Sequence, residues 1–425
     1  MDDLRLLHAA DLHVDSPMRG LAAYDGAPVD EVRSATRRAL SALVDEAVRR
    51  SVHAVLLAGD LYDGTWRDFN TGLFVASELA RLHDAGIPVV LVHGNHDAES
   101  QLTRRLRLPP NVTVLGSSAP ETTLLDDLGV AVHGQSYPTR AVVDDLAAGY
   151  PEADPGLLNV GLLHTCLDGT LGHQPYAPCS TRALRAKRYD YWALGHVHEH
   201  RVVERDPLIV FPGNLQGRHV REAGPKGAVL ATFRGRQGSV EQLVVDQVRW
   251  EQPEVDCTGA SDVDEVLDRC RSVLEVAADV DRRCVAVRLV LGGTTRCDAA
   301  LRSRQEWLTA EVRAASLATG GAPLLVEQVV LATAPARPLL DPGGGGLGGE
   351  LARVLDELRP SLAAVVADEA GRLAPLASLR AQLRALCDLE ATGLGDEALP
   401  GLLDDAAALL LERLAAAAEG RSRAH

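Results

Sequence analysis

Five hydrophobic segments in the first half of the chain each end in side chains that can bind a metal ion. Each segment has the composition of a buried β-strand and is followed by Asp, Asn or His. If five such strands lie side by side, their terminal side chains converge on one crevice at the carboxyl edge of the sheet. The segments are LRLLHAADLH (4–13), AVLLAGD (54–60), VVLVHGNHD (89–97), NVGLLH (159–164) and YWALGHVH (191–198).

Seven side chains at these strand ends are candidate metal ligands. Carboxylate, amide and imidazole groups without a thiolate suit Mn, Fe or Zn. Seven ligands are too many for one tetrahedral ion, but they suit two ions if one carboxylate bridges them. Two ions ~3.5–4 Å apart can bind a phosphate between them and activate a bridging water. The seven are Asp11, His13, Asp60, Asn95, His164, His196 and His198.

The local spacing of these residues supports shared binding. Asp11 and His13 are two positions apart, as are His196 and His198, so each pair faces one side of an extended segment. A glycine directly precedes three of the seven ligands. Glycine allows the backbone to turn sharply and to approach the ions closely. The pattern therefore predicts a two-metal hydrolase.

His96 and Asp97 complete the tetrapeptide Gly-Asn-His-Asp after the third strand. His96 need not be a ligand, because it can face the phosphate and protonate the leaving oxygen. We predict that Asp97 orients this imidazole and raises its pKa. The two residues are therefore the candidate catalytic pair.

Length and composition limit the class of protein. A chain of 425 residues is long enough for two or three domains. Its net charge of −16 argues against a general attraction to nucleic acid, although local arginine clusters could still contact it. No apolar run reaches the ~20 residues of a membrane span, and the acidic start is unlike a signal peptide. Seven scattered cysteines without a CxxC pair predict reduced thiols in a bacterial cytoplasm.

The chain divides into four predicted regions. Residues 1–250 alternate between strand-like and helix-like segments, and their second half has the short connections of a more antiparallel arrangement. A mixed sheet, or two sheets packed face to face with outer helices, fits this region. Residues 251–340 predict a small α+β module, with one helix over 299–315. A glycine-rich linker at 341–349 precedes a helical C-terminal region, 350–425, that could dock a partner.

The metal-binding segments resemble a known superfamily. DLH, GDLYD, GNHD, the segment around His164 and GHVH are similar to the calcineurin-like metallophosphoesterases. HAADLHVDSP (8–17) and FPGNLQGRHVREAGPKG (211–227) resemble the SbcD-type DNA repair exonucleases, particularly their bacterial YhaO-like branch. The resemblance is strong over residues 1–250 and weak over 251–340. It implies an α/β (α+β) fold, in which a two-sheet sandwich flanked by helices carries a small α+β capping domain. The helical C-terminal region is predicted from its own spacing and is not part of the resemblance.

The resemblance also implies a division of the ligands between the two ions. Asp60 would bridge the ions, and His96 would be the catalytic histidine. One ion would take Asp11, His13, Asp60 and His198, and the other Asp60, Asn95, His164 and His196.

The implied reaction is cleavage of DNA phosphodiesters with Mn²⁺, or with Fe²⁺ or Zn²⁺, in an exonuclease of DNA repair. The implied partner is a coiled-coil, SMC-like ATPase that gates access to DNA. A homodimer is a further expectation, and membrane association is not expected. Arg218, His219 and Arg104 are candidate contacts to the substrate.

Two other functions fit the same residues. The same metal site could hydrolyse phosphoesters of nucleotides or phosphoproteins, since the metal ligands do not select a substrate. The chain could also be a non-catalytic scaffold subunit of a repair complex, although the intact His96–Asp97 pair argues against that function. The segment from Phe211 to Gly227 and the region after residue 250 favour the nuclease, because a minimal phosphatase needs neither.

Overall fold

A computed structural model describes residues 3–18, 21, 32, 34–63, 69–99, 106–169, 176–278, 283–319 and 322–336. The described residues fall into two compact units. The first contains the chain up to Gln252 together with described residues of 277–288 and 320–327. The second contains the remaining described residues from Pro253 onward. The predicted linker at 341–349 and the predicted helical region at 350–425 lie outside the described residues.

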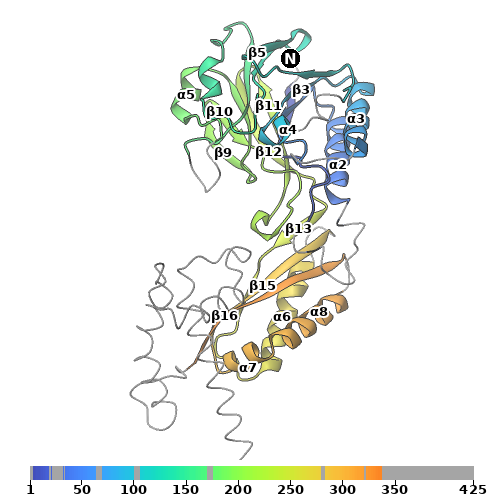
Figure 1. Ribbon diagram of the computed structural model, residues 1–425, viewed down its shortest axis with the longest axis vertical. Coiled ribbons are helices and arrows are strands. Elements are labelled where there is room, and N and C mark those ends of the chain that lie inside the picture. Colours follow the sequence, from blue (N-terminus) through green and yellow to red (C-terminus); the bar gives the residue numbers. More distant parts are fainter. Residues whose placement is uncertain are drawn as a thin grey trace, which may run out of the picture. The chain divides into compact units, whose positions relative to one another are not determined.

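Two six-stranded sheets form the body of the first unit (Figure 1). In the first sheet, the four strands β1 to β4 run parallel, and β11 and β12 add an antiparallel edge beside β1. The strand order is β12 (Gln237–Val244), β11 (Gly227–Arg234), β1 (Leu4–Ala9), β2 (Ala54–Ala58), β3 (Val89–Val92) and β4 (Val112–Val114).

The second sheet is more parallel than the sequence led us to expect. Its four inner strands run parallel, and only the edge strands β5 and β9 are antiparallel to their neighbours. The segments that join β6 to β7 and β7 to β8 are long enough for the crossovers that parallel pairing requires. The strand order is β5 (Glu121–Leu125), β6 (Val130–Gly134), β7 (Leu158–His164), β8 (Tyr191–Gly195), β10 (Leu208–Phe211) and β9 (Arg201–Arg205).

Helices cover the outer faces of the two sheets. In Figure 1, α2 and α3 lie on one side of the first unit and α5 lies on the other. The short α4 begins directly after the loop that follows β3. The helical segments are α2 (Ala35–Arg49), α3 (Phe69–Asp84), α4 (Asn95–Glu99), α5 (Thr181–Ala186), η1 (Asp126–Leu128), η2 (Leu146–Gly149) and η3 (Val220–Glu222).

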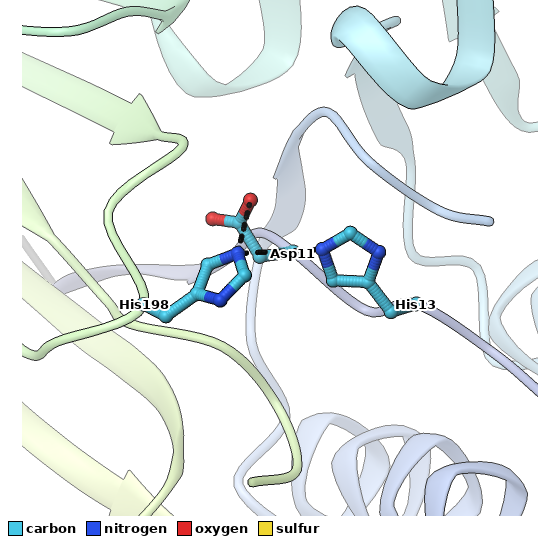
Figure 2. A group of neighbouring side chains, drawn as sticks. All are labelled: Asp11, His13 and His198. Carbon is cyan, nitrogen blue, oxygen red and sulfur yellow. Dashed lines mark hydrogen bonds and ion pairs between the residues drawn. The ribbon is translucent and has the colours of Figure 1, made fainter. Parts of the chain in front are cut away.

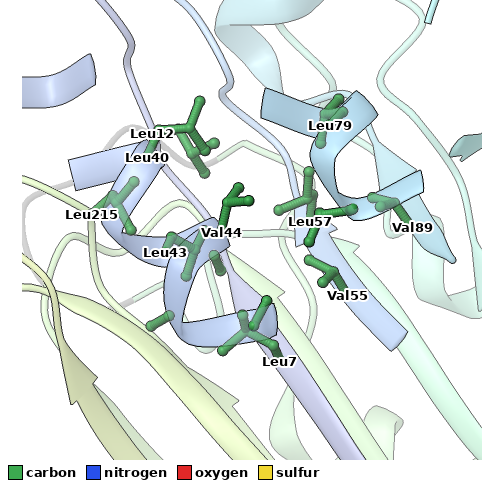
Figure 3. Close-up of a cluster of buried hydrophobic side chains, with 14 of the residues drawn as sticks. Leu7, Leu12, Leu40, Leu43, Val44, Val55, Leu57, Leu79, Val89 and Leu215 are labelled. Atoms are coloured by element: carbon green, nitrogen blue, oxygen red, sulfur yellow. The ribbon is translucent and has the colours of Figure 1, made fainter. Parts of the chain in front are cut away.

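One hydrophobic core lies between the first sheet and the helices α2 and α3 (Figure 3). Leu40, Leu43 and Val44 recur at helical spacing, so α2 turns a continuous apolar stripe toward the strands. Val55 and Leu57 of β2 meet that stripe. Each such fully buried side chain contributes roughly 1.5–3 kcal/mol relative to an exposed one.

A second core lies between the two sheets, because successive side chains of a strand point to opposite faces. Ala54, Leu56 and Ala58 of β2 alternate with the helix-facing residues and pack toward the second sheet. Val160 and Leu162 of β7 belong to the same cluster. The two-sheet sandwich flanked by helices is therefore confirmed, and the two sheets bring their carboxyl edges close together.

The chain after the sandwich alternates strands and helices, as a small α+β module requires. In the first unit, β13 pairs in parallel with the first residues of β15. In the second unit, β14 pairs in parallel with later residues of β15. The single helix expected over 299–315 is two helices, which meet at Arg304. The elements are β13 (Val248–Glu251), β14 (Glu254–Asp256), α6 (Val263–Ala278), β15 (Cys284–Thr295), α7 (Asp298–Ser303), α8 (Gln305–Ala318) and β16 (Leu324–Pro335).

Two expectations from composition concern the described part of the chain. None of its helices has both the length and the hydropathy that a membrane span requires. Its six cysteines are buried, and no disulfide joins them.

Candidate metal centre

All five metal-binding segments end at one place in the first unit, but they belong to two sheets. The first three follow β1, β2 and β3 of the first sheet, whereas the other two follow β7 and β8 of the second. The five strands therefore lie in two sheets packed face to face, which is one of the two arrangements that the sequence suggested. Because parallel strands end at the same edge and the sheets pack face to face, the site lies where two carboxyl edges meet.

Asp11, His13 and His198 form the first cluster (Figure 2). Asp11 and His13 come from the loop after β1, and His198 comes from the loop after β8. The Nε2 atoms of the two imidazoles lie 3.3 Å apart. His198 Nε2 is also 3.5 Å from Asp11 Oδ1. Three ligand atoms from segments that are distant in sequence thus point at one position.

Asp60 and His164 form the second cluster with Asn95, and Asp11 lies within ligand distance of this cluster as well as of the first. His164 Nε2 lies 3.0 Å from Asn95 Oδ1 and 3.5 Å from Asp60 Oδ2. The same Asp60 oxygen is 4.0 Å from His13 Nε2 of the first cluster. Asp60 therefore lies between the two clusters, where a bridging carboxylate belongs.

The distances between ligand atoms fit bound ions. Two ligand atoms that are each ~2.1 Å from one ion lie roughly 3.0–3.4 Å apart in octahedral or tetrahedral geometry. The His13–His198 and His164–Asn95 distances fall in that range. Oxygen and nitrogen donors without a thiolate suit first-row divalent ions. The residues present thus fit a pair of divalent metal ions.

Second contacts orient the three imidazoles so that each turns Nε2 into the site. His164 Nδ1 is 2.8 Å from the carbonyl oxygen of Ala58. His198 Nδ1 is 2.7 Å from Glu222 Oε1, and His13 Nδ1 is 2.8 Å from Asp63 Oδ1. The hydrogen bonds at Nδ1 of His164 and His198 hold the proton there and leave the Nε2 lone pair for a metal. At His13 the Asp63 contact places a carboxylate beside Nδ1.

The electrostatics of the buried ligands also favour cations. Burial raises the pKa of Asp60, and the neighbouring carboxylates of Asp97 and Asp11 raise it further. Burial lowers the pKa of His13 to about 3, which keeps its imidazole neutral and able to bind a metal. Burial alone would lower the pKa of His198, but the carboxylates of Asp11 and Glu222 raise it to about 9. Metal binding to His198 would therefore release a proton.

The backbone of the ligand loops is held in uncommon conformations. Asp11, His13 and Asp60 have φ angles of 51°, 43° and 54°, in the left-handed region that non-glycine residues rarely adopt. Such conformations persist where the surrounding structure imposes them, and they are concentrated at functional sites. At Gly195, a Cβ atom would lie 2.0 Å from the carbonyl oxygen of Ala58. The close approach expected of the glycines is thus present at Gly195.

His196 lies beside the second cluster. Its ring centroid is 5.2 Å from that of His164, and its backbone N–H donates to Asp11 Oδ2 at 2.9 Å. The residue therefore helps to fix Asp11 as well as facing the cluster to which the family resemblance assigns it.

His96 stands at the edge of the site on α4. Its backbone N–H donates to Asp60 Oδ1 at 2.9 Å, and its ring lies 5.1 Å from the ring of His13. Its side chain remains 32% exposed, so a substrate can reach it. Its Nδ1 atom is 3.9 Å from Asp63 Oδ1.

Asp97 has other partners than the predicted one. Its carboxylate accepts hydrogen bonds from the backbone N–H groups of Tyr62 and Gly94, at 3.2 and 3.1 Å. Asp97 therefore joins the loops after β2 and β3. Asp63 is a carboxylate that lies close to the imidazole of His96.

The three candidate substrate contacts have different outcomes. Arg218 is 15% exposed and its guanidinium contacts Asp63 and Glu222, so it is occupied within the protein. His219 is 34% exposed and its Nε2 lies 3.6 Å from Glu222 Oε1. Arg104 lies outside the described residues.

The sequence reasoning missed the roles of Asp63 and Glu222. Asp63 was visible as the final residue of GDLYD, three positions after Asp60. Glu222 lies in the segment from Phe211 to Gly227 that the family resemblance had marked. The pairing of an acid with a particular ligand histidine is a signal that only the folded chain reveals.

Comparison with known proteins agrees with this geometry. Residues 4–200 match the model of the calcineurin-like phosphoesterases, and residues 250–334 match that of the middle domain of the metallophosphoesterase YhaO. The uncharacterized metallophosphoesterase YhaO of Bacillus subtilis is 34% identical over 298 residues, which cover 69% of this chain and 73% of YhaO. This chain belongs to the calcineurin-like phosphoesterase family.

More distant members of the family are repair proteins by name. The DNA double-strand break repair protein Mre11 of Methanopyrus kandleri is 27% identical over 343 residues, with 71% of each chain covered. Mre11 of Sulfurisphaera tokodaii is 25% identical over 261 residues, which cover 58% of this chain and 64% of that protein.

The arrangement can carry out phosphoester hydrolysis. Divalent ions in the two clusters would bind a phosphate group through their positive charge and would lower the pKa of a bound water. The side chains of the clusters hold those positions, and Asp60 links them. His96, exposed beside the clusters, can donate a proton to the leaving oxygen. Asp63 places a carboxylate oxygen 3.9 Å from the Nδ1 atom of His96.

Proposed function

We propose that this protein is a two-metal nuclease that hydrolyses DNA phosphodiesters, as an exonuclease of DNA repair in the bacterial cytoplasm. The observation that carries the proposal is the pair of neighbouring ligand groups, which share Asp11 and between which Asp60 lies, with His96 open to substrate beside them. Manganese is the proposed metal, because hard oxygen ligands and imidazoles together suit it. The names of the Mre11 relatives support DNA as the substrate.

The first experiment measures release of nucleotides from end-labelled linear duplex DNA by the full chain with Mn²⁺. His96→Ala should lower the rate by roughly 10²–10⁴-fold, because it removes the proposed general acid. His83→Ala is the matched control, since His83 is an exposed histidine on the last turn of α3. It should retain the activity of the wild type.

Two outcomes would contradict the proposal. Equal DNA hydrolysis by the wild type and His96→Ala would remove His96 from the reaction. Hydrolysis of nucleotide phosphoesters or of a phosphopeptide by a metal-loaded protein that leaves DNA intact would replace the nuclease with a phosphatase of the same chemistry.

We further propose that a coiled-coil, SMC-like ATPase binds this chain and gates its access to DNA, and that the chain forms a homodimer. The net charge of −16 supports a partner, because this chain by itself would repel the phosphate backbone over much of its surface. Co-purification with the ATPase and an ATP-dependent change in the nuclease rate are expected. An unchanged rate at saturating partner would contradict the gating.

A further inference from the structure

Glu222 is a buried carboxylate whose two oxygens are both engaged. It is 6% exposed. Its Oε1 atom accepts hydrogen bonds from His198 Nδ1 at 2.7 Å and from Arg218 Nη2 at 3.1 Å. Its Oε2 atom accepts from Asn214 Nδ2 at 2.9 Å and from the backbone N–H of Arg218 at 2.7 Å. The carboxylate that orients His198 is therefore itself held mainly by Arg218.

Asp63 has the corresponding relation to the other histidine of the first cluster. Its Oδ1 atom lies 2.8 Å from His13 Nδ1 and 3.4 Å from Arg218 Nη1. Arg218 Nη1 also donates to Ser16 Oγ at 3.4 Å. One guanidinium thus spans the two carboxylates that orient His13 and His198.

We propose that Arg218 is a positioning residue for the first cluster, where it ties together the carboxylates that aim the imidazoles of His13 and His198 at one ion. The inference rests on the two-metal site of the proposed function. The planar guanidinium of Arg218 can donate to two carboxylates in fixed directions, whereas the ammonium group of a lysine has no such fixed geometry. It also supplies positive charge where Asp11, Asp63 and Glu222 would otherwise repel one another.

Among the residues that the structure describes, no arginine or lysine pairs with the ligands of the second cluster. The Nδ1 contact of His164 is to the backbone carbonyl of Ala58, in the neighbouring sheet. His164 is fully buried and belongs to a strand. Loss of Arg218 should therefore weaken one ion and spare the other, whereas loss of a substrate contact would weaken neither.

The test titrates the metal-free full chain with Mn²⁺ in the absence of DNA, by calorimetry and by the electron paramagnetic resonance of coupled manganese pairs. Arg218→Ala should weaken one of the two binding events by roughly 10–100-fold, as loss of contacts behind a ligand typically does. The other event should stay close to the wild-type affinity. The coupled-pair signal should then appear only at a higher metal concentration.

Three further variants complete the experiment. Arg218→Lys should bind the affected ion more tightly than Arg218→Ala, because lysine restores the positive charge but not the planar arrangement of N–H donors. Glu222→Gln should weaken the same binding event, and the double variant with Arg218→Ala should lose less than the sum of the two single losses. Arg236→Ala is the control, since Arg236 is a half-exposed arginine that pairs with Asp190 away from the ligands. It should bind both ions as the wild type does.

The result that would overturn the inference is equal weakening of both ions, or normal binding of both with reduced affinity for DNA. Normal binding of both ions would return Arg218 to the role of a substrate contact. If Arg218→Ala does not fold, Arg218→Lys and Glu222→Gln decide the question by the same titration. The titration contains no DNA, so it tests the role of Arg218 separately from the nuclease activity. A protein that does not cut DNA can still show that Arg218→Ala weakens the binding of one metal ion and not of the other.

Discussion

The two halves of the metal centre are built in different ways. In the second cluster, His164 belongs to a buried strand and its Nδ1 atom contacts a backbone carbonyl of the other sheet. In the first cluster, His198 and His13 lie in loops and contact the carboxylates of Glu222 and Asp63. The sheets therefore position one half, whereas a network of charged side chains positions the other. A substitution that removes one kind of support should therefore weaken the binding of one metal ion more than that of the other.

The largest effect should come from Asp60→Asn, which acts on both halves at once. The variant loses the bridging charge, so both ions should bind weakly and the hydrolytic rate should fall by on the order of 10³-fold. The metal-free protein should instead become more stable, because burial and the nearby Asp97 and Asp11 raise the pKa of the Asp60 carboxyl. Metal titration and thermal unfolding of the metal-free protein measure the two changes. A destabilised metal-free variant would show that the crowded carboxylates do not oppose folding.

Gly195→Ala should act on the half that the sheets position. Its Cβ atom would lie 2.0 Å from Ala58 O and 2.9 Å from His164 Nδ1, so the sheets must move apart or His164 must shift. The cost in the free energy of unfolding should be about 1–3 kcal/mol. Binding of one metal ion should weaken. The double variant of Gly195→Ala and Arg218→Ala should then bind both metal ions weakly. Gly86→Ala offers a comparison, because its Cβ atom would meet no neighbouring atom and only its positive φ opposes the substitution. Equal metal binding by Gly195→Ala and the wild type would remove the distinction between the halves.

The smallest effect concerns His8, a buried histidine of β1 whose two ring nitrogens contact no carboxylate. Its Nδ1 atom is 2.8 Å from Tyr191 Oη and its Nε2 atom is 3.1 Å from Leu194 O. Burial lowers the pKa of His8 to about 3. Below pH ~6.5 the unfolded chain therefore binds a proton at His8 that the folded chain does not bind. The free energy of unfolding should then decrease as the pH falls below that value.

The expected slope from His8 is about 1.4 kcal/mol per pH unit below pH ~6.5. Urea unfolding between pH 7 and 5 measures it, and His8→Gln should show a shallower dependence than the wild type. His53→Gln provides the control, since His53 is a half-buried histidine that accepts from the backbone of Arg5. Parallel curves for His8→Gln and the wild type would mean that His8 does not contribute to the pH dependence.

The strands and their ligands were largely predictable, because both signals are local. Apolar runs of four to seven residues predicted β1, β2, β3, β7 and β8, since strand length and composition depend on near neighbours. The direction of the inner strands of the second sheet was not predictable in the same way. It depends on where the chain returns after each strand, and short apolar segments look alike in parallel and antiparallel sheets.

The partners of the charged residues were the least predictable part of the site. Asp97 was expected beside His96 because it is next in sequence, yet it binds the backbone at Tyr62 and Gly94. Arg218 was expected to face the substrate, yet it joins Asp63 to Glu222. Asp63 and Arg218 are 155 positions apart, and such a distant contact leaves no local pattern by which one sequence could reveal it.

The sequence by itself determined the chemistry available to this protein: oxygen and nitrogen ligands at five strand ends, and an intact Gly-Asn-His-Asp segment. It could do so because residue type decides what a side chain can bind and strand periodicity decides where it points. Only the tertiary structure decided that the five strand ends come from two sheets, and that Asp60 lies between the clusters. It alone decided which carboxylate serves which histidine, because those relations arise from packing two sheets face to face and from loops that meet across them.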